Sequence, residues 1–331
     1  MKKTLLCFFL LLPILVYSQE ELRYADKVRI NEAIKISGFV SDNIWKDWSQ
    51  TPFVILLVTD STEYLINHPY PSSDFSQSYF DSYLNTNVYS RKRVYPTGFL
   101  ATFPAVNGVS CVVVGTAENT KKDNIDWVIT LLHEHFHQYQ NNYPGYLEGV
   151  DNLDLKNGDE SGMWMLNYNF PYEDTQIISA FEDMKFKLNT AFLKNDEKNF
   201  RGKVKQYLKS KNKFKKLLSE KDFRYFDFQL WQEGLARYTE YKVLSYLENN
   251  GYKFSDEFTS ISDSLNLKKH YQQTMLNLVK EFEDVELNNY KRVSFYSFGA
   301  IEGLVLDTYN KKWRNKYFKN MFSTTKLFNK K

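Results

Sequence analysis

Three of the five histidines in this 331-residue chain lie within five positions, in the segment His133-Glu134-His135-Phe136-His137. On an α-helix, residues i and i+4 lie about 40° apart on neighbouring turns, so the imidazoles of His133 and His137 can reach one ion. This His-Glu-x-x-His pattern is typical of a helix that holds zinc, with Glu134 near enough to take a proton from a metal-bound water. The pattern therefore predicts a metal-binding helix.

The residues that flank the motif predict the bounds of this helix. Asp123 can cap its start, with Asp126 three residues later, and Pro144-Gly145 follow its end. Apolar residues at helical spacing predict one buried face: Val128, Leu131, Leu132, Phe136 and Tyr139. His135 points away from His133 and joins that face, so we expect a packed histidine that supports the site and is not a ligand.

Runs of β-branched and apolar residues predict a sheet in the first half of the chain, after a mixed, helical stretch from Glu20 to Trp48. The predicted strands are Phe53–Val58, Thr62–Asn67, Asn87–Val94, Phe99–Phe103 and Val109–Val114. The first two can pair across Thr59-Asp60-Ser61. Pro69, Pro71 and the serines between residues 72 and 78 predict a loop.

Helical spacing dominates from Asp174 onward. The predicted helices span residues 175–193, 197–218, 227–249, 268–284 and 291–319. Residues 143–172, rich in glycine and aromatic residues, predict a long loop or a set of short pieces, either a rim of the substrate cleft or a loop pinned by its own aromatic side chains. We expect an α+β fold, with a sheet-bearing lobe over 19–150, a helical lobe over 151–331 and a cleft between them.

Residues 1–18 have the pattern of a secretion signal, with Lys2-Lys3, an apolar run from Leu5 to Val16 and a small residue before Gln19. We expect this signal to be removed and the mature protein to be secreted or periplasmic. No later segment has the roughly eighteen uninterrupted apolar residues of a membrane span, so the sequence predicts no transmembrane segment in the mature chain.

The net charge bears on the class of binding partner, and the cysteine content bears on disulfide bonds. The formal charge of +3 becomes +1 without Lys2 and Lys3 (3 − 2), which gives no bulk electrostatic case for nucleic acid. Residues 194–221 carry eleven basic against three acidic residues, and their spacing favours the solvated face of an amphipathic helix over a site for an anionic partner. Cys111 is alone beyond the signal, so we expect no internal disulfide. The oligomeric state stays open.

Two histidines leave a zinc site short of a third protein ligand, commonly a carboxylate or a histidine. Glu233 is the best candidate, because it lies early on a strongly apolar helix beside Trp231 and Leu235, where an unpaired charge is costly. The alternative is an ordinary glutamate on the helix surface. Glu240, on the same helix, is the next candidate ligand or a residue that supports the ligands from behind.

Three segments of the chain resemble the motifs of a known family. The segments His133-Glu134-His135-Phe136-His137-Gln138 and Glu233-Gly234-x-Ala236-x-Tyr238-x-Glu240-Tyr241 look like the paired motifs of the gluzincin metallopeptidases, particularly the aminopeptidase N type. A third segment, Tyr296-Ser-Phe-Gly299-Ala300, is similar to that family's Tyr-x-x-Gly-Ala segment.

The resemblance implies a zincin-like catalytic domain with one Zn²⁺ ion. His133, His137 and Glu233 would bind the ion, Glu134 would be the general base, and Tyr296 would stabilise the oxyanion. A core tyrosine is the alternative for Tyr296, and its rivals for the role lie on the ligand helix: Tyr238 and Tyr241.

The chain also departs from that family. About 95 residues separate His137 from Glu233, where the aminopeptidases have a short spacing, so we expect inserted helices between the two ligand helices. There is no room for the large N-terminal β domain of those enzymes. The resemblance covers roughly residues 105–310 and is confined to the motifs.

A further segment bears on which end of a peptide is recognised. Residues 112–119 resemble the Gly-Ala-Met-Glu-Asn segment of the aminopeptidases, whose glutamate binds the free amino group of the substrate. By that resemblance Glu118 would hold an ammonium group. The alternative is that Glu118 belongs to an ordinary polar turn before the helix cap, which would leave the enzyme an endopeptidase.

We therefore expect zinc-dependent hydrolysis of a peptide or protein substrate outside the cytoplasm, with endopeptidase and aminopeptidase activity both open. Two alternatives remain: a catalytically silent binding protein with a zincin fold, against which the intact base Glu134 argues, and a hydrolase of a non-peptide amide or ester.

Overall fold

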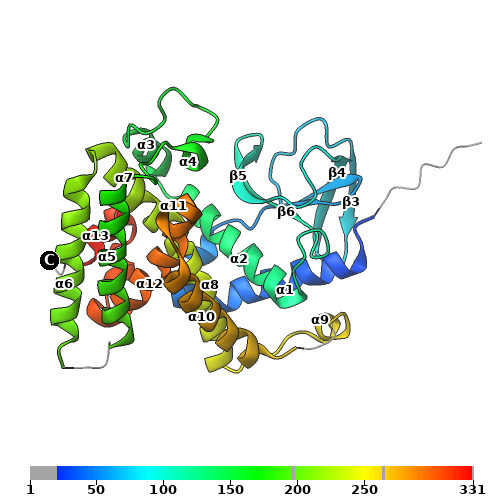
Figure 1. Cartoon of the computed structure of the whole chain (residues 1–331). Helices are drawn as coiled ribbons and strands as arrows, with labels where there is room; N and C mark the ends of the chain where they lie inside the picture. Colours follow the sequence, from blue (N-terminus) through cyan, green and yellow to red (C-terminus); the bar gives the residue numbers. More distant parts are fainter. Residues whose placement is uncertain (1–20, 195–197, 263–264, 330–331) are drawn as a thin grey trace, which may run out of the picture.

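The computed structural model describes residues 21–194, 198–262 and 265–329. The segment predicted as a secretion signal, residues 1–18, lies outside this part of the chain. A six-stranded sheet, on the right of Figure 1, is joined to helices that fill the middle and the left of the view. The α+β class expected from the sequence is confirmed.

The strands of the sheet follow the order β3-β4-β2-β1-β6-β5. Neighbours are antiparallel except β1 and β6, which are parallel. The strands are β1 Ile55–Val58, β2 Thr62–Ile66, β3 Gln77–Asp81, β4 Thr86–Lys92, β5 Leu100–Val106 and β6 Val109–Gly115. The predicted hairpin of β1 and β2 is confirmed, and β5 forms an edge of the sheet.

Strand β3 is the part of the sheet that the sequence pattern does not predict, since Gln77 and Ser78 fall in the expected serine-rich loop. It forms the edge opposite β5, and four of its five residues are exposed or half-buried. Ser78 lies opposite Tyr89 of β4, so the backbone of β3 completes the pairing. A strand of this kind has no apolar face for a sequence pattern to reveal.

Helix α2, Asn124–Asn141, carries the His-Glu-x-x-His motif, and its predicted start is confirmed. The side chain of Asp123 accepts a hydrogen bond of 2.8 Å from the backbone N–H of Asp126. This bond satisfies one of the free N–H groups of the first turn. The helix ends before Pro144-Gly145, as expected.

Two buried side chains fix α2 against the sheet. Trp127 donates its indole N–H to the carbonyl of Gly115 at the end of β6, at 2.9 Å. Near the other end of α2, the amide of Gln138 donates to the carbonyls of Val54 and Ser110 at 2.9 and 2.8 Å. These bonds hold the motif helix at both ends, because a buried polar group is costly to leave unpaired.

The helical part of the chain follows the predicted spacing, with some breaks. The predicted helix 175–193 matches α5, Thr175–Leu193, while helix 291–319 is cut short at Tyr309, the end of α12. The other helices are α1 Tyr24–Ile44, α3 Tyr146–Asp151, α4 Trp164–Asn167, α6 Phe200–Leu217, α7 Glu220–Gln229, α8 Leu235–Asn249, α9 Asp256–Ser260, α10 Leu267–Asp284, α11 Leu287–Tyr290 and α13 Thr324–Leu327. Residues 143–172 thus contain two short helices, α3 and α4.

Alternate residues of β1 face two different clusters of buried apolar side chains. Ile55 and Leu57 belong to a large cluster that runs from Leu22 to Phe328, while Leu56 and Val58 belong to a small one on the other face of the sheet. The large cluster joins the sheet to the helices, so both halves of the chain share a core. Within the described residues, no helix has the length and apolar character that a membrane crossing requires.

The basic helix α6 buries an apolar stripe that includes Val204, Tyr207 and Phe214, as its spacing predicts. One of its lysines departs from the expected solvated face. Lys211 is 1% exposed, and its Nζ lies 2.8 Å from Glu302 and 3.3 Å from Asp227. A buried ammonium group of this kind requires such partners.

Candidate metal centre

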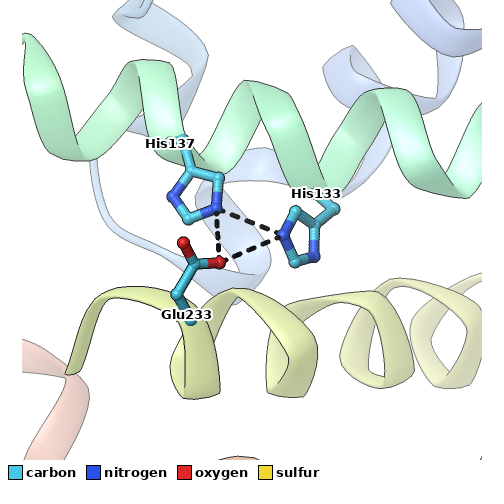
Figure 2. Close-up of side chains that lie close together, drawn as sticks. All are labelled: His133, His137 and Glu233. Atoms are coloured by element: carbon cyan, nitrogen blue, oxygen red, sulfur yellow. Dashed lines mark hydrogen bonds and ion pairs between the residues drawn. The ribbon is translucent and has the colours of Figure 1, made fainter. Parts of the chain in front are cut away.

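Three side chains from distant parts of the sequence converge between α2 and the helix that follows Leu230 (Figure 2). The Nε2 atoms of His133 and His137 lie 3.1 Å apart. The Oε2 atom of Glu233 lies 3.4 Å from His137 Nε2 and 4.0 Å from His133 Nε2. The three predicted ligands, His133, His137 and Glu233, therefore form one triangle of donor atoms, although Glu233 lies 96 positions beyond His137 (233 − 137).

The size of this triangle fits a zinc ion. With bonds of about 2.0–2.1 Å, ligand atoms around a tetrahedral zinc ion lie about 3.3–3.4 Å apart. The observed separations of 3.1, 3.4 and 4.0 Å bracket that value. Two imidazoles and one carboxylate leave the fourth position of a tetrahedron open. The Glu233 side chain is 18% exposed, so solvent reaches part of this carboxylate.

The backbone that carries Glu233 is irregular. Residues Leu230–Gly234 form a π-helical turn between α7 and α8, where the sequence pattern predicts one continuous helix over 227–249. A π turn adds a residue to the helical repeat and so changes the direction in which the side chains around it point. Glu233 leaves this turn toward α2 (Figure 2).

Glu240 lies behind His133. Its Oε1 accepts a hydrogen bond of 2.6 Å from His133 Nδ1, and Arg237 holds its Oε2 at 2.7 Å. Burial alone would raise the pKa of Glu240, but Arg237 and His133 outweigh burial and lower this pKa to about 2. The carboxylate thus accepts the hydrogen bond of Nδ1–H and leaves Nε2 of His133 to face the other candidate ligands.

Gln140, which was not predicted from the sequence, has the same role for His137. Its Oε1 lies 2.6 Å from His137 Nδ1, while its Nε2 donates to the carbonyl of Gln232 at 3.0 Å and to the hydroxyl of Tyr317 at 2.6 Å. These two acceptors fix the direction of the amide. His137 therefore donates through Nδ1 and presents Nε2 to the site. A glutamine three residues after a candidate ligand, on one face of the helix, is the signal that could have revealed it.

The candidate base Glu134 is buried on α2 between the two histidines. The hydroxyl of Thr102, on the edge strand β5, lies 2.8 Å from Glu134 Oε2 and 2.9 Å from the backbone carbonyl of Glu134. Thr102 thereby fixes the carboxylate next to the ligand triangle. No local pattern in the sequence identifies this threonine, because its partner lies 32 positions away.

Tyr296 lies at the same site. Arg292, one turn earlier, donates to its hydroxyl at 2.5 Å and lies 3.6 Å from Glu233 Oε1. Burial, and after it the charge of Glu233, raise the pKa of Tyr296 well above its usual range. The rival tyrosines are engaged elsewhere: Tyr238 donates to Asp307, and the hydroxyl of Tyr241 pairs with Tyr271. Of the three tyrosines, Tyr296 is the one brought beside a candidate ligand.

His135 is packed away from the triangle. Its ring stacks on Phe53 with centroids 4.0 Å apart, and its Nδ1 pairs with Gln138 Oε1 at 2.9 Å. Burial lowers the pKa of His135 to about 4, so the ring is neutral at physiological pH. It supports the helix that carries the two candidate histidine ligands.

Glu118 is not brought to the site. Both of its oxygens pair with arginines near helix α1, Oε2 with Arg23 at 2.8 Å and Oε1 with Arg29 at 2.9 Å. Arg29 also contacts Asn124, the first residue of α2, from which His133 is about 13 Å away along the helix axis. The arrangement matches the polar-turn alternative, since both oxygens of Glu118 already pair with arginines.

Opposite charges hold the three converging side chains together. Burial alone would lower the pKa of His137, but the carboxylates of Glu233 and Glu134 outweigh it and raise this pKa to about 9. Burial alone would raise the pKa of Glu233, and the two histidines reverse that effect and lower it to about 2. A cation is therefore favoured at this position, and a metal ion competes there with a proton.

A second group of possible ligands lies at the exposed start of α2. His270 has one ring nitrogen 3.9 Å from Asp123 and the other 3.5 Å from Asp126. All three side chains are exposed or half-buried, and Asp123 also caps α2, so this group lacks the buried surroundings of the His133–His137–Glu233 triangle.

No model of a protein family matches this chain, and neither a curated protein nor a solved structure does. The positions of its own residues are therefore the basis for assigning a role to the three converging side chains.

Proposed function

We propose that this protein is a zinc-dependent peptidase of the gluzincin type, with a zincin-like fold. The observation that carries the proposal is the triangle of His133, His137 and Glu233, with Glu134 between the histidines on the same helix. Zinc-dependent hydrolysis of this type requires two ligands and a general base from one helix and a third ligand from another.

When bound at these three atoms, zinc supplies a Lewis acid that acidifies water and polarises a carbonyl group. Glu134 accepts the proton of the attacking water and returns it to the leaving nitrogen. Thr102 holds Oε2 of Glu134, so we assign the proton transfer to Oε1. The hydroxyl of Tyr296 donates to the carbonyl oxygen of the substrate as its negative charge develops.

The edge strand β5 favours a peptide as the substrate. An extended peptide can add to the free edge of a sheet through main-chain hydrogen bonds. Because Thr102 of β5 contacts Glu134, a peptide paired with this strand lies beside the base. With the signal pattern of residues 1–18, we propose that hydrolysis takes place outside the cytoplasm, in a periplasm or after secretion.

The test is the metal content of the purified protein, measured together with its activity on a peptide library with and without a chelator. We expect one zinc ion per chain and peptide cleavage that the chelator abolishes and added zinc restores. His133→Ala, His137→Ala and Glu233→Ala each lose bound zinc, whereas Glu134→Gln retains zinc and loses turnover.

Two results would overturn the proposal. One is a folded protein that binds no zinc at micromolar concentration. The other is zinc binding with cleavage that survives in Glu134→Gln, which would assign the base to another residue.

A further inference from the structure

Arg292 contacts two residues of the site from one position. Its Nη1 lies 2.5 Å from the hydroxyl oxygen of Tyr296 and 3.6 Å from Oε1 of Glu233. The Arg292 side chain is only 20% exposed, and its guanidinium lies over the Tyr296 ring, 5.2 Å from the centroid. One cation therefore joins the candidate third ligand to the candidate oxyanion donor.

The two oxygens of Glu233 are divided between the histidines and Arg292. Oε2 faces the Nε2 atoms of His133 and His137, and Oε1 faces the guanidinium. A partial rotation of the carboxylate would move both oxygens away from these partners and break the ion pair. Arg292 thus presents one oxygen of Glu233 to the ligand triangle.

The same guanidinium determines the direction of the Tyr296 hydroxyl proton. An arginine has only donors, so the phenol oxygen must act as the acceptor in this bond. The phenol proton cannot point at Arg292, and the hydroxyl also hydrogen-bonds with Glu233, so this proton lies on the side of the ligand triangle. A hydroxyl oriented in advance stabilises a developing negative charge better than one that must first rotate.

The backbone around Arg292 supports this position. Lys291 has a φ of 47° and a ψ of −128°, a conformation that residues with a side chain rarely adopt. Lys291 follows the last residue of α11 and begins the short turn Lys291–Val293, which precedes α12. Arg292 and Tyr296 are then four residues apart on one helical face. Strained residues of this kind persist where the surrounding structure holds them, often next to functional sites.

We propose that Arg292 is a positioning residue, which holds one oxygen of Glu233 toward the metal ligands and turns the hydroxyl proton of Tyr296 toward the substrate. This inference rests on the proposed peptidase function and adds to it a residue outside the recognised motifs.

The experiment compares Arg292→Met, which keeps the length of the side chain, Arg292→Lys, which keeps the charge, and Lys291→Met, which removes a charge from the exposed neighbour. We expect Arg292→Met to lower kcat about 10- to 100-fold with KM changed less than about 3-fold, and to weaken zinc binding about 10-fold. Arg292→Lys recovers part of both losses, and Lys291→Met behaves as the parent.

A double variant tests whether Arg292 acts through Tyr296. If the arginine acts by orienting the hydroxyl, Arg292→Met should lower kcat little further in a protein that already lacks this hydroxyl. We therefore expect the kcat of the double variant to be within about 3-fold of that of Tyr296→Phe alone. Independent, multiplicative losses would overturn the tyrosine part of the inference.

A spectroscopic readout separates this inference from the peptidase function. In the cobalt-substituted protein, the visible absorption bands report the geometry and kind of the metal ligands, and we expect them to shift in Arg292→Met and not in Lys291→Met. Unchanged bands, zinc affinity and kcat in a folded Arg292→Met protein would overturn the inference, while the parent kept its activity. A parent that binds zinc but cleaves no peptide would overturn the proposed function, and the spectra would still test the effect of Arg292 on Glu233.

Discussion

Gly234 and Gly299 touch backbone to backbone where the π-helical turn meets α12. A Cβ added to Gly234 would lie 2.5 Å from the Cα of Gly299, and one added to Gly299 would lie 2.7 Å from the Cα of Gly234. Gly234 follows the candidate ligand Glu233, and Gly299 lies about one turn after Tyr296. The absence of two side chains therefore determines how closely the carboxylate and the hydroxyl approach each other.

We predict that Gly299→Ala lowers both stability and activity. The new methyl group would also lie 2.7 Å from the carbonyl oxygen of Leu230, and backbone atoms cannot move aside as a flexible side chain can. Overpacking of this kind costs about 1–3 kcal/mol, which outweighs the gain of about 1 kcal/mol from replacing glycine in a helix. Thermal unfolding and kcat measure the two effects.

Gly38→Ala is the matched control. Gly38 lies in α1, is exposed, and has no atom within 4 Å of an added Cβ. The same substitution there should stabilise the protein by about 0.5–1 kcal/mol and leave kcat unchanged. If Gly299→Ala behaved like Gly38→Ala, the close approach of the two helices would not determine the geometry of the site.

The sequence predicts the parts of this site that depend on local geometry. His133, Glu134 and His137 belong to one helix, and their positions follow from its 3.6-residue period. Glu233 is predicted for an energetic reason, since a carboxylate on an apolar helix requires a partner. Its direction toward α2 is not predictable, because it depends on a π turn and on contact with Gly299.

Residues whose role depends on distant partners leave no local pattern. Thr102 contacts Glu134 from an edge strand, and Arg292 lies outside the recognised Tyr-x-x-Gly-Ala segment. Lys211 lies in a lysine-rich helix that predicts a solvated face, and only the fold brings Glu302 to it from 91 positions away. The same limit applies to β3, since an exposed edge strand pairs through its backbone.

We predict that Gln140→Leu weakens zinc binding about 10- to 100-fold, the usual effect of losing a group that orients a histidine ligand. Leucine keeps the approximate volume of glutamine but cannot accept the hydrogen bond from Nδ1–H of His137. Competition with a chromogenic chelator measures the affinity.

Gln138→Leu is the control for this substitution. Gln138 is equally buried on the same helix, and its Oε1 pairs with the packed His135 instead of a ligand. We expect it to lower thermal stability, because the carbonyls of Val54 and Ser110 lose their donor, and to leave zinc affinity close to that of the parent. Equal effects of the two variants on zinc would assign the loss to helix packing.

Thr102→Val should impair the general base Glu134 without affecting zinc binding. The substitution keeps the shape of the side chain and removes the hydroxyl that holds Glu134. We expect unchanged zinc content and a fall in kcat of about 10-fold, since the carboxylate can then leave its position. Thr102→Ser, which restores the hydroxyl, should recover most of the rate. A Thr102→Val enzyme as fast as the parent would show that Glu134 needs no support from β5.

Glu118→Ala should not alter which end of a peptide is recognised. The carboxylate pairs with Arg23 and Arg29, and its side chain is 52% exposed, so its loss should cost less than about 1 kcal/mol of stability. Rates on free and N-acetylated forms of one peptide should keep the ratio of the parent. A loss of activity that is confined to peptides with a free amino group would show that Glu118 binds this group.

Zinc affinity should rise with pH through the neutral range. In the metal-free site, Glu233 and Glu134 face His137 and outweigh burial, so the pKa of His137 is about 9. Zinc requires the lone pair of Nε2, so below pH 9 binding must displace this proton, and this proton alone makes the affinity rise about tenfold per pH unit. Titration calorimetry at pH 7.5 in two buffers with different ionisation enthalpies should therefore detect the release of at least one proton per zinc ion. An affinity that stays constant between pH 7 and 8.5, without proton release, would mean that His137 is already neutral in the free site and that the charge of Glu233 is balanced elsewhere, with Arg292 as the nearest candidate.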